Sequence, residues 1–335
     1  MRPPDVQHRF NDPVRAGSVD ACTQCAPGVL LVRPARFGTN SETAASNRFQ
    51  QVVPLSRDIS ERARSEFDAL CAALKQAGVK LCVVDDTAEP PKPDAVFPNN
   101  WVSFHRDGTV MLYPMLPANR RTERRIGILE AVESRLKFQR RRLIDLSEHE
   151  REGRMLEGTG SLVLDHVRRT AYACRSPRTD ESLVREWSAL MNYEPLLFEA
   201  NGSDGTPLYH TNVMLSIGAH FAVVCADAIV EADRERVLQR LHDSEREVIE
   251  ISMQAMSGFG ANILELSGRD ETGSEQSVLV LSEQARTALQ DPDSLDWDRL
   301  SGCVDVVVAV AIPTIESVGG GSARCMLAEV PDTRV

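Results

Sequence analysis

The sequence predicts an α/β fold in which five copies of one unit, ββαβ, form a closed ring around a pseudo-fivefold axis. One order of patterns recurs at intervals of roughly 50 to 60 residues: two strand-like runs, a stretch with helical spacing of apolar residues, and a further strand-like run. The first segment has only the later half of this unit, and a run near the C-terminus supplies the missing strand. Such repeats are typical of solenoids and propeller-like rings, and a last strand that completes the first unit indicates closure.

Turn residues and apolar periodicity define the elements of each unit. Arg106-Asp107-Gly108, for example, separates the two hairpin strands of the second unit. The residues that recur on one helix face in the first unit are Ile59, Ala63, Phe67, Leu70 and Leu74. In chain order the predicted elements are strand 29–32, helix 58–77 and strand 80–84 in the first unit, which strand 325–330 completes; strands 95–104 and 110–114, helix 126–136 and strand 142–146 in the second; strands 161–164 and 170–174, helix 179–191 and strand 195–198 in the third; strands 213–217 and 221–225, helix 233–243 and strand 247–251 in the fourth; and strands 261–266 and 276–281, helix 282–289 and strand 303–312 in the fifth, whose polar stretch 268–275 we interpret as an inserted loop.

Composition limits the classes of function. The 335 residues are 42% hydrophobic and 26% charged, as in an ordinary globular protein. The net charge of −11 argues against a nucleic-acid partner, and we interpret the basic cluster 120–125 as the solvated start of a helix. No apolar run has the length that spans a membrane, which argues against a membrane partner. Eight cysteines without an N-terminal signal sequence indicate a reducing, cytoplasmic environment.

We divide the chain into a flexible N-terminal tail, residues 1–27, and a single catalytic domain, residues 28–335. The tail is polar, contains proline and shows no periodicity. Cys22 and Cys25 form a Cys-x-x-Cys pair there, but the second ligand pair of a zinc site and the βαβ context of a redox motif are both missing. We therefore expect neither a metal nor an organic cofactor. The sequence leaves the oligomeric state open, a homo-oligomer included.

Cys325 has the setting of a nucleophile. It lies at the end of Gly319-Gly320-Gly321-Ser322-Ala323-Arg324-Cys325, shortly after the apolar run 304–312. Glycines let the backbone approach a ligand and free amide groups to bind an anion, and Arg324 would favour thiolate over thiol. The alternative is a buried structural thiol, the commonest state of a free cysteine. The other cysteines that fit this alternative better, on a helix face or in strand-like runs, are Cys71, Cys82, Cys174, Cys225 and Cys303.

Polar residues stand at the start of the hairpin in every unit. Because equivalent positions of a ring converge on its axis, we expect these side chains to meet. They are Asn99 and Asn100, Glu157, His210 with Asn212, Asn262, and Cys325. A nucleophile, a base and an orienting carboxylate would then share one point, which is the minimum for covalent catalysis. Taken singly, each has an ordinary alternative: a solvated loop carboxylate, a core histidine, or asparagines that cap a turn.

These residues lie in strings that resemble the guanidino-group-modifying superfamily of the pentein fold, which includes arginine deiminases, dimethylargininases and amidinotransferases. The resemblance is closest to its bacterial arginine-deiminase-related, citrulline-utilization hydrolase branch. It extends over nearly the whole chain, from Leu31 to Val330. The matching strings are Arg33-Pro34-Ala35-Arg36-Phe37-Gly38, Phe97-Pro98-Asn99-Asn100-Trp101-Val102-Ser103, Leu156-Glu157-Gly158-Thr159-Gly160-Ser161, Ser176-Pro177-Arg178-Thr179-Asp180, Tyr209-His210-Thr211-Asn212-Val213-Met214, and Ile312-Pro313-Thr314-Ile315-Glu316 with Gly319–Met326.

The resemblance implies a pentein ring and assigns roles within it. Cys325 matches the superfamily's nucleophile, His210 its general acid and base, and Glu157 the carboxylate that contacts the substrate nitrogens. Arg178 matches an arginine that holds the α-carboxylate of the substrate, a task suited to its bidentate fork. Some deiminases carry a second arginine where this chain has Gly320. We also expect Asn99 and Arg324 to contact the substrate.

Two asparagines depart from the superfamily pattern and suggest the substrate. Enzymes of this superfamily that act on cationic guanidinium groups commonly hold them with aspartates, where this chain has Asn100 and Asn212. An asparagine offers an acceptor and two donors, which suit the C=O and N–H groups of a neutral ureido group. We therefore predict hydrolysis of citrulline to ornithine, ammonia and CO2. The alternatives are an arginine or dimethylarginine hydrolase or deiminase, an amidinotransferase, and a pentein ring that only binds a partner.

Overall fold

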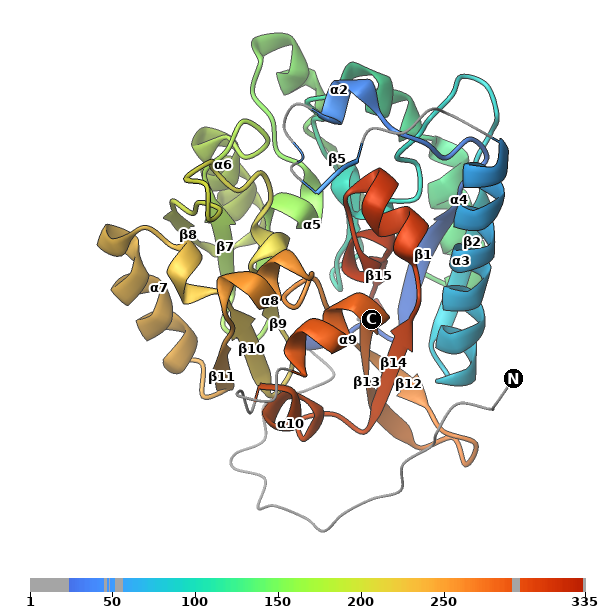
Figure 1. Cartoon of the computed structure of the whole chain (residues 1–335). Helices are drawn as coiled ribbons and strands as arrows, with labels where there is room; N and C mark the ends of the chain where they lie inside the picture. Colours follow the sequence, from blue (N-terminus) through green and yellow to red (C-terminus); the bar gives the residue numbers. More distant parts are fainter. Residues whose placement is uncertain (1–23, 45–46, 48, 52–56, 291–295, 334–335) are drawn as a thin grey trace.

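The computed structural model describes residues 24–44, 47, 49–51, 57–290 and 296–333, which form the predicted α/β ring (Figure 1). It contains five sheets of three strands. In each sheet the middle strand pairs antiparallel with one neighbour and parallel with the other. A helix joins each parallel pair of strands, because parallel strands need a crossover connection. The prediction of five ββαβ units is thus confirmed.

The elements of the ring have the following bounds. The first sheet contains β15 (Ala328–Val330), β1 (Gly28–Arg33) and β2 (Lys80–Asp85), with helix α3 (Arg57–Gln76); the second β3 (Val102–Phe104), β4 (Thr109–Leu112) and β5 (Arg142–Asp145), with α4 (Ile126–Leu136); the third β6 (Val163–Asp165), β7 (Thr170–Cys174) and β8 (Glu194–Phe198), with α6 (Glu181–Met191); the fourth β9 (Leu215–Ile217), β10 (Phe221–Val224) and β11 (Glu247–Glu250), with α7 (Glu231–His242); and the fifth β12 (Leu264–Arg269), β13 (Glu275–Ser282) and β14 (Val306–Val310), with α9 (Glu283–Leu289) and α10 (Asp296–Ser301). Shorter helical elements are α2 (Ser41–Ala44), η1 (Pro98–Asn100), η2 (Ala118–Glu123), η3 (Ser147–Glu152), α5 (Gly158–Ser161), η4 (Thr211–Val213), η5 (Ala226–Ala228), α8 (Met253–Ser257), η6 (Ile315–Gly319) and η7 (Ala323–Met326).

The two ends of the described chain close the ring. Strand β15 pairs antiparallel with β1, in the register Gly28↔Val330 to Leu30↔Ala328. Figure 1 shows the red C-terminal strand against the blue first strand. The predicted completion of the first unit by a C-terminal strand is confirmed.

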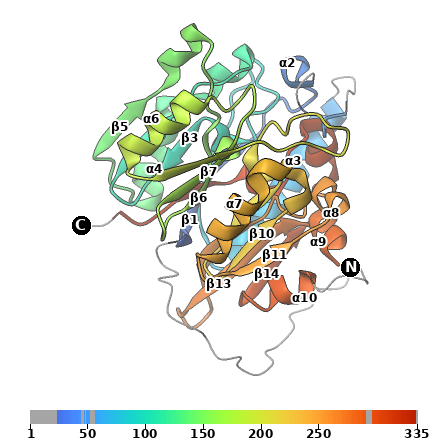
Figure 2. The ribbon, with the colours of Figure 1, turned by 90° about the vertical axis from the view of Figure 1, so that its left-hand side faces the viewer.

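Helices cover the outside of the ring and their apolar faces form the core with the sheets. Figure 2 shows α6 and α7 in front of strands β7 and β10. On α3, Phe67 and Leu70 are fully buried against the first sheet, as the helical spacing predicts. Burial of such a side chain stabilises the fold by about 1.5–3 kcal/mol. Within the described residues, no helix is long and apolar enough to cross a membrane.

Several boundaries differ from the sequence predictions, and three differences change how a segment is described. The strand predicted at 95–104 is only Val102–Phe104, because Pro98 opens a 3-10 turn instead of pairing in a ladder. The stretch 268–275 is not an inserted loop: it extends the hairpin of β12 and β13 and turns at Asp270, whose side chain accepts three hydrogen bonds from backbone N–H or hydroxyl groups of Thr272 and Ser274. Part of the predicted tail 1–27 packs into the fold, since the Gln24 side chain is buried and donates to the carbonyls of Leu164 and Ile217. Cys22 lies outside the described residues.

Candidate active site

Four units place a short helical turn directly before their first hairpin strand. These turns are η1, α5, η4 and η7. The turn α5 contacts both η1 and η4, and η1 contacts η7, so the four converge as the ring geometry predicts. Gly158 makes this approach feasible: its φ of +48° belongs to the left-handed region, and a Cβ atom there would lie 2.2 Å from the Asn99 carbonyl oxygen.

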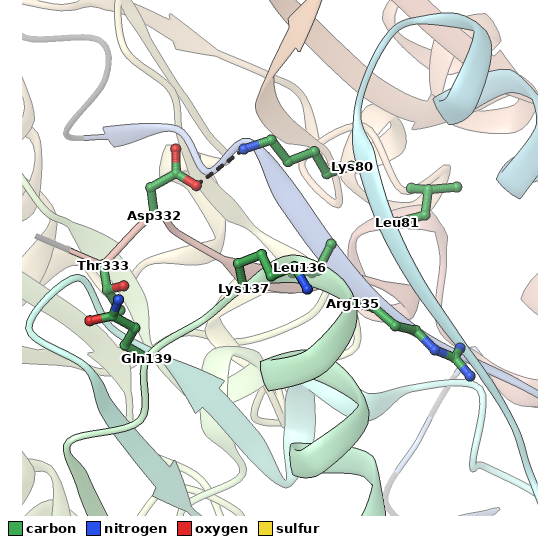
Figure 3. Close-up of a pocket in the computed structure, with 8 residues that line it drawn as sticks. All are labelled: Lys80, Leu81, Arg135, Leu136, Lys137, Gln139, Asp332 and Thr333. Carbon is green, nitrogen blue, oxygen red and sulfur yellow. Dashed lines mark hydrogen bonds and ion pairs between the residues drawn. The ribbon is translucent and has the colours of Figure 1, made fainter.

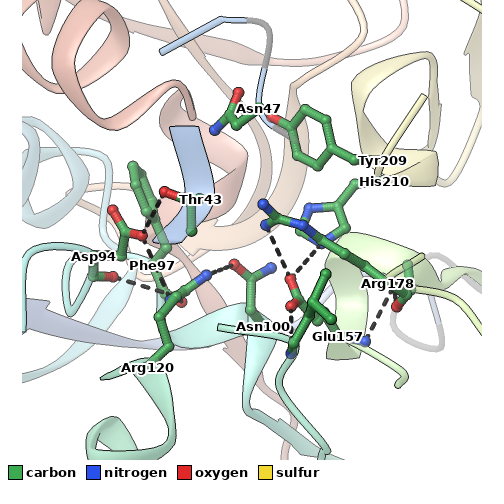
Figure 4. Close-up of polar contacts among 12 residues, drawn as sticks. Thr43, Asn47, Asp94, Phe97, Asn100, Arg120, Glu157, Arg178, Tyr209 and His210 are labelled. Carbon is green, nitrogen blue, oxygen red and sulfur yellow. Dashed lines mark hydrogen bonds and ion pairs between the residues drawn. The ribbon is translucent and has the colours of Figure 1, made fainter. Parts of the chain in front are cut away.

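Glu157, His210 and Arg178 form a buried charged cluster at this junction (Figure 4). Oε2 of Glu157 lies 2.8 Å from Nε2 of His210 and accepts a hydrogen bond from Nη1 of Arg178 at 3.2 Å. Oε1 accepts from the backbone N–H of Leu116 at 3.0 Å. Burial raises the pKa of Glu157, but the Arg178 charge and the His210 hydrogen bond outweigh it and hold the pKa well below its ordinary value. Glu157 is therefore ionised at neutral pH.

His210 is a neutral base in this environment. Burial lowers the pKa of His210, and the hydrogen bond and charge of Glu157 offset only part of that effect. Because Glu157 accepts the hydrogen bond from Nε2, Nδ1 is left as the ring's acceptor. The guanidinium of Arg178 also lies over the ring of Tyr209, with its carbon 5.0 Å from the ring centroid. The structure thus brings together three of the predicted site residues.

Cys325 lies in the same junction and contacts two asparagines. Nδ2 of Asn262 lies 3.3 Å from Sγ and Nδ2 of Asn212 lies 3.6 Å from it. Burial raises the pKa of the Cys325 thiol, and the Asn262 hydrogen bond and the Arg324 charge offset only part of that effect. Arg324 thus favours the thiolate, as predicted, but its effect on the pKa is smaller than that of burial. Among the described residues, no hydrogen bond joins Sγ to His210.

The guanidinium of Arg324 bonds to groups other than Cys325. Nη1 donates to the carbonyl of Leu327 at 2.9 Å, and Nη2 pairs with Glu329 at 2.8 Å. The side chain lines a separate small cavity of about 40 Å³, together with His105 and His166. Because the Glu329 carboxylate already neutralises its charge, the structure does not support the predicted substrate contact of Arg324.

The asparagines have opposite orientations. Oδ1 of Asn100 accepts a hydrogen bond from Nη1 of Arg120 at 2.8 Å, which leaves Nδ2 buried and without a partner among the described residues. In Asn212 the Nδ2 atom faces Sγ of Cys325, and Oδ1 has no hydrogen-bond partner among the described residues. The Asn99 amide is fully buried, and neither of its atoms has a described partner. Buried unpaired polar groups are costly, at about 1–3 kcal/mol each, which indicates that a ligand completes them.

Sequence analysis missed two charged residues beside this cluster. Arg120 was expected on a solvated helix start, but it is buried in η2 and bonded to Glu123 through Nε at 2.9 Å. Asp94 is buried as well: Oδ2 accepts from Asn40 at 2.7 Å, whereas Oδ1 has no partner in the described residues. Burial raises the pKa of Asp94, and the Arg120 charge offsets part of that effect. The spacing Arg120-x-x-Glu123 could have signalled a pair, since residues three apart face each other on a helical turn.

Gly320 packs closely against the side chain of Asn47 in the loop before Cys325. Nδ2 of Asn47 donates to the carbonyls of Gly319 and Gly320, each at 3.2 Å, and the Tyr209 hydroxyl donates to Gly320 at 2.9 Å. Gly320 has a φ of +66°, and a Cβ atom there would lie 2.5 Å from Nδ2 of Asn47. The arginine that some deiminases carry at this position therefore does not fit this arrangement.

A surface hollow elsewhere on the ring contains none of these residues. It has a volume of about 550 Å³ and lies between β2, the end of α4 and the C-terminal segment (Figure 3). Its Lys80 side chain pairs with Asp332 at 3.2 Å. In the described part of the chain, no group of three His, Cys, Asp or Glu side chains is arranged to hold a metal ion. The junction of the helical turns is thus the candidate active site.

Comparison with known proteins identifies the family of the chain. Residues 33–331 match the family model of the eukaryotic N,N-dimethylarginine dimethylhydrolases. The chain belongs to this family. It is therefore a member of the guanidino-modifying pentein superfamily and of its hydrolases of C–N bonds. Curated protein sequences contain no significant match.

Solved structures share the fold of this family member at low sequence identity. The N-terminal domain of ArgZ, a cyanobacterial arginine dihydrolase of the ornithine-ammonia cycle, is 16% identical with a TM-score of 0.65, and 92% of this chain aligns with 99% of it in the substrate-bound form. A dimethylarginine dimethylaminohydrolase with an S-methyl-L-thiocitrulline adduct is 15% identical with a TM-score of 0.62, over 90% of this chain and 98% of that one. AgrE bound to L-arginine is 16% identical with a TM-score of 0.67, but the aligned region is only 40% of its length.

Gly160 offers a direct test of the site in this family member. A Cβ atom on Gly160 would lie 2.5 Å from Nδ2 of Asn100 and 2.8 Å from Nδ1 of His210. We expect Gly160→Ala to lower kcat/KM about 100-fold or more, because displacement of catalytic groups by about 1 Å costs that much. The measurement is steady-state kinetics on the substrate that the protein hydrolyses, with circular dichroism to verify folding. Gly127→Ala in α4, where a Cβ meets nothing within 4 Å, is the control and should keep full activity.

Proposed function

We propose that the protein hydrolyses the ureido C–N bond of citrulline to give ornithine, ammonia and CO2. The orientation of the two asparagines carries the proposal. Asn100 presents a donor, which suits a ureido oxygen, and Asn212 presents an acceptor, which suits a ureido N–H. A guanidinium group has only donors, so it would place N–H against the Nδ2 atom of Asn100.

Covalent catalysis follows from the residues around the junction. Sγ of Cys325 attacks the ureido carbon, and Nδ2 of Asn100 stabilises the developing oxyanion. His210 takes the thiol proton through Nδ1 and delivers it to the departing ammonia. His210 then activates water, which breaks the C–S bond and releases a carbamate that decays to ornithine and CO2. Glu157 orients the histidine throughout and accepts a substrate N–H.

The resting thiol explains why catalysis would begin only with substrate in place. Burial keeps Cys325 protonated, so the free protein does not carry a reactive thiolate at neutral pH. A bound substrate fills the space between Sγ and His210, and proton transfer then accompanies attack. We assign the α-carboxylate of the substrate to Arg178, whose guanidinium lies beside Glu157 and over the ring of Tyr209.

Hydrolysis of arginine or dimethylarginine is the second candidate function. The matched family and the solved relatives are named for these substrates. Two buried carboxylates, Glu157 and Asp94, favour a positively charged group nearby. The α-ammonium group of citrulline could also pair with one of these two carboxylates. The carboxylates are therefore compatible with citrulline as well as with arginine or dimethylarginine.

A substrate panel separates them directly. Purified protein is incubated with citrulline, arginine and asymmetric dimethylarginine in separate reactions, and the amino-acid product is identified by mass. We expect ornithine and ammonia from citrulline, at a kcat/KM at least about tenfold above that for arginine. Release of citrulline from arginine or dimethylarginine, with inert citrulline, would contradict the proposal. The Cys325→Ser variant serves as the blank.

A further inference from the structure

We propose that Tyr209 is a positioning residue that ties the glycine loop 319–322 to the turn carrying His210. This inference rests on the proposed function, in which Cys325 is the nucleophile and His210 the base. The glycine loop leads directly into η7, which carries Cys325, and Tyr209 directly precedes His210. Oη of Tyr209 donates a hydrogen bond to the carbonyl of Gly320 at 2.9 Å, across 111 residues of sequence. This bond therefore joins the segment of the nucleophile to the segment of the base.

The Tyr209 hydroxyl is a permanent donor to the glycine loop. Tyr209 is buried, and burial raises the pKa of its hydroxyl group well above the ordinary value. The group therefore stays protonated at neutral and moderately alkaline pH. A carbonyl oxygen has two lone pairs, and Nδ2 of Asn47 donates the second hydrogen bond to Gly320 at 3.2 Å. The Gly320 carbonyl is thus fully bonded, and Tyr209 makes the shorter of its two bonds.

The remainder of Tyr209 is fixed on the side of the base. Its ring centroid lies 4.8 Å from that of His210, and Figure 4 shows its hydroxyl end directed toward Asn47. Its backbone carbonyl accepts a hydrogen bond from Oγ of Ser176 at 2.8 Å. The guanidinium carbon of Arg178 lies 5.0 Å from its ring centroid. A shift of Tyr209 would disturb all these contacts, so its hydroxyl group is a fixed point for the glycine loop.

The glycine loop needs such a fixed point because it contains three consecutive glycines. Glycine loses more conformational freedom on ordering than any other residue, so a glycine-rich loop opens readily unless its backbone is bonded. The loop also packs against the nucleophile: a Cβ atom on Gly321 would lie 3.3 Å from Cβ of Cys325. The backbone N–H of Cys325 donates to the Ser322 carbonyl at 3.0 Å. A displacement of the loop therefore displaces Cys325.

Tyr209→Phe tests the hydroxyl group alone, because the ring and its contact with Arg178 remain. We expect kcat to fall about tenfold or more, since a small displacement of a reacting group is costly, whereas KM should stay within about twofold. The measurement is steady-state ornithine production from citrulline, with thermal melting to verify folding. Tyr172→Phe is the matched control. It removes the same atom from a buried tyrosine whose hydroxyl has no hydrogen-bond partner among the described residues, so kcat should not change.

The rate of Cys325 alkylation by iodoacetamide tests the inference without any substrate. We expect Tyr209→Phe to increase this rate about two- to tenfold at a fixed pH, because loss of one hydrogen bond lets the glycine loop open more often. Cys174 is fully buried in β7 and serves as the internal control, whose rate should not change. Peptide mapping by mass spectrometry follows both residues in one sample.

The two measurements together distinguish positioning from a general effect on the fold. Slower turnover with faster alkylation of Cys325 alone would support the inference. Equal acceleration at Cys325 and Cys174 would show a general loosening of the fold and would overturn it, as would an unchanged kcat or an unchanged rate at Cys325. If the parent protein does not hydrolyse citrulline, the proposed function fails, and the alkylation rates alone then decide whether Tyr209 holds the glycine loop.

Discussion

Replacing Cys325 with serine should lower kcat by at least about 10³-fold while the protein folds normally, because an alcohol at this position is a far weaker nucleophile than a thiol. Among the described residues, the side chains that bond to Sγ are the amides of Asn212 and Asn262, so no second thiol bonds to it. The measurement is steady-state ornithine production, with thermal melting to verify folding. Activity within about tenfold of the parent would exclude Cys325 as the nucleophile. Cys71→Ser, on the surface helix α3, is the matched control.

The pH dependence of Cys325 alkylation should show that the pKa of its thiol is raised. The rate of reaction with iodoacetamide should increase with pH to values above the ordinary cysteine pKa of about 8.5, because the thiolate is the reactive form. Asn262→Ala removes a hydrogen bond that favours the thiolate, so it should slow the reaction at a fixed pH. Peptide mapping by mass spectrometry follows the modified residue. A pH-independent rate would mean that Cys325 is not the labelled thiol.

Replacing Glu157 with glutamine should lower kcat about 10²-fold or more, the usual contribution of acid–base catalysis. The variant keeps the shape of the side chain but loses the charge that orients His210 and faces Arg178. Its loss should not add to that of His210→Ala in the double variant, because the two side chains act as one unit. Additive free energies of activation in a double-mutant cycle would show that they act separately.

The same variant should lose stability in a pH-dependent manner. The folded pKa of Glu157 is depressed, so its ionised form contributes stability above the unfolded pKa of about 4.3, and this contribution disappears as the pH falls through the folded value. The melting temperature of Glu157→Gln should therefore be lower than that of the parent at pH 7. The difference between the two melting temperatures should become smaller below about pH 4. Glu152→Gln, at an exposed position in η3, is the control and should show little difference at either pH. A difference in melting temperature that stays the same at both pH values would contradict a stabilising role of ionised Glu157.

The recurring unit and the location of the site were both predictable from local patterns. Apolar periodicity defines a helix such as α3, and the position before each hairpin predicts that Glu157, His210 and Cys325 meet, because a ring brings equivalent positions together. The predictions depended on local spacing and on symmetry, and both are visible in one sequence. Element ends were less accurate where a single residue such as Pro98 changed the local backbone.

Side-chain partners across units were beyond such patterns. Arg120 lies in a basic cluster and has the composition of a solvated surface, but Glu123 in the same turn and Asn100 from η1 bury it. Arg324 is adjacent to Cys325 in sequence, yet Glu329 draws its guanidinium toward β15. Both outcomes depend on which charge lies nearest in space. The separation of two residues along the sequence says little about which charges lie close together in the fold.

Strand β15 also constrains when the active site can exist during biosynthesis. The strand pairs with β1 across about 300 residues, and Cys325 lies in the turn that leads directly into it. Contacts between such distant residues carry a high entropic cost and form late in folding. A nascent chain can therefore assemble the units that carry Glu157 and His210 while Cys325 is still on the ribosome. Catalytic competence would appear in a single step, when the two ends of the ring join.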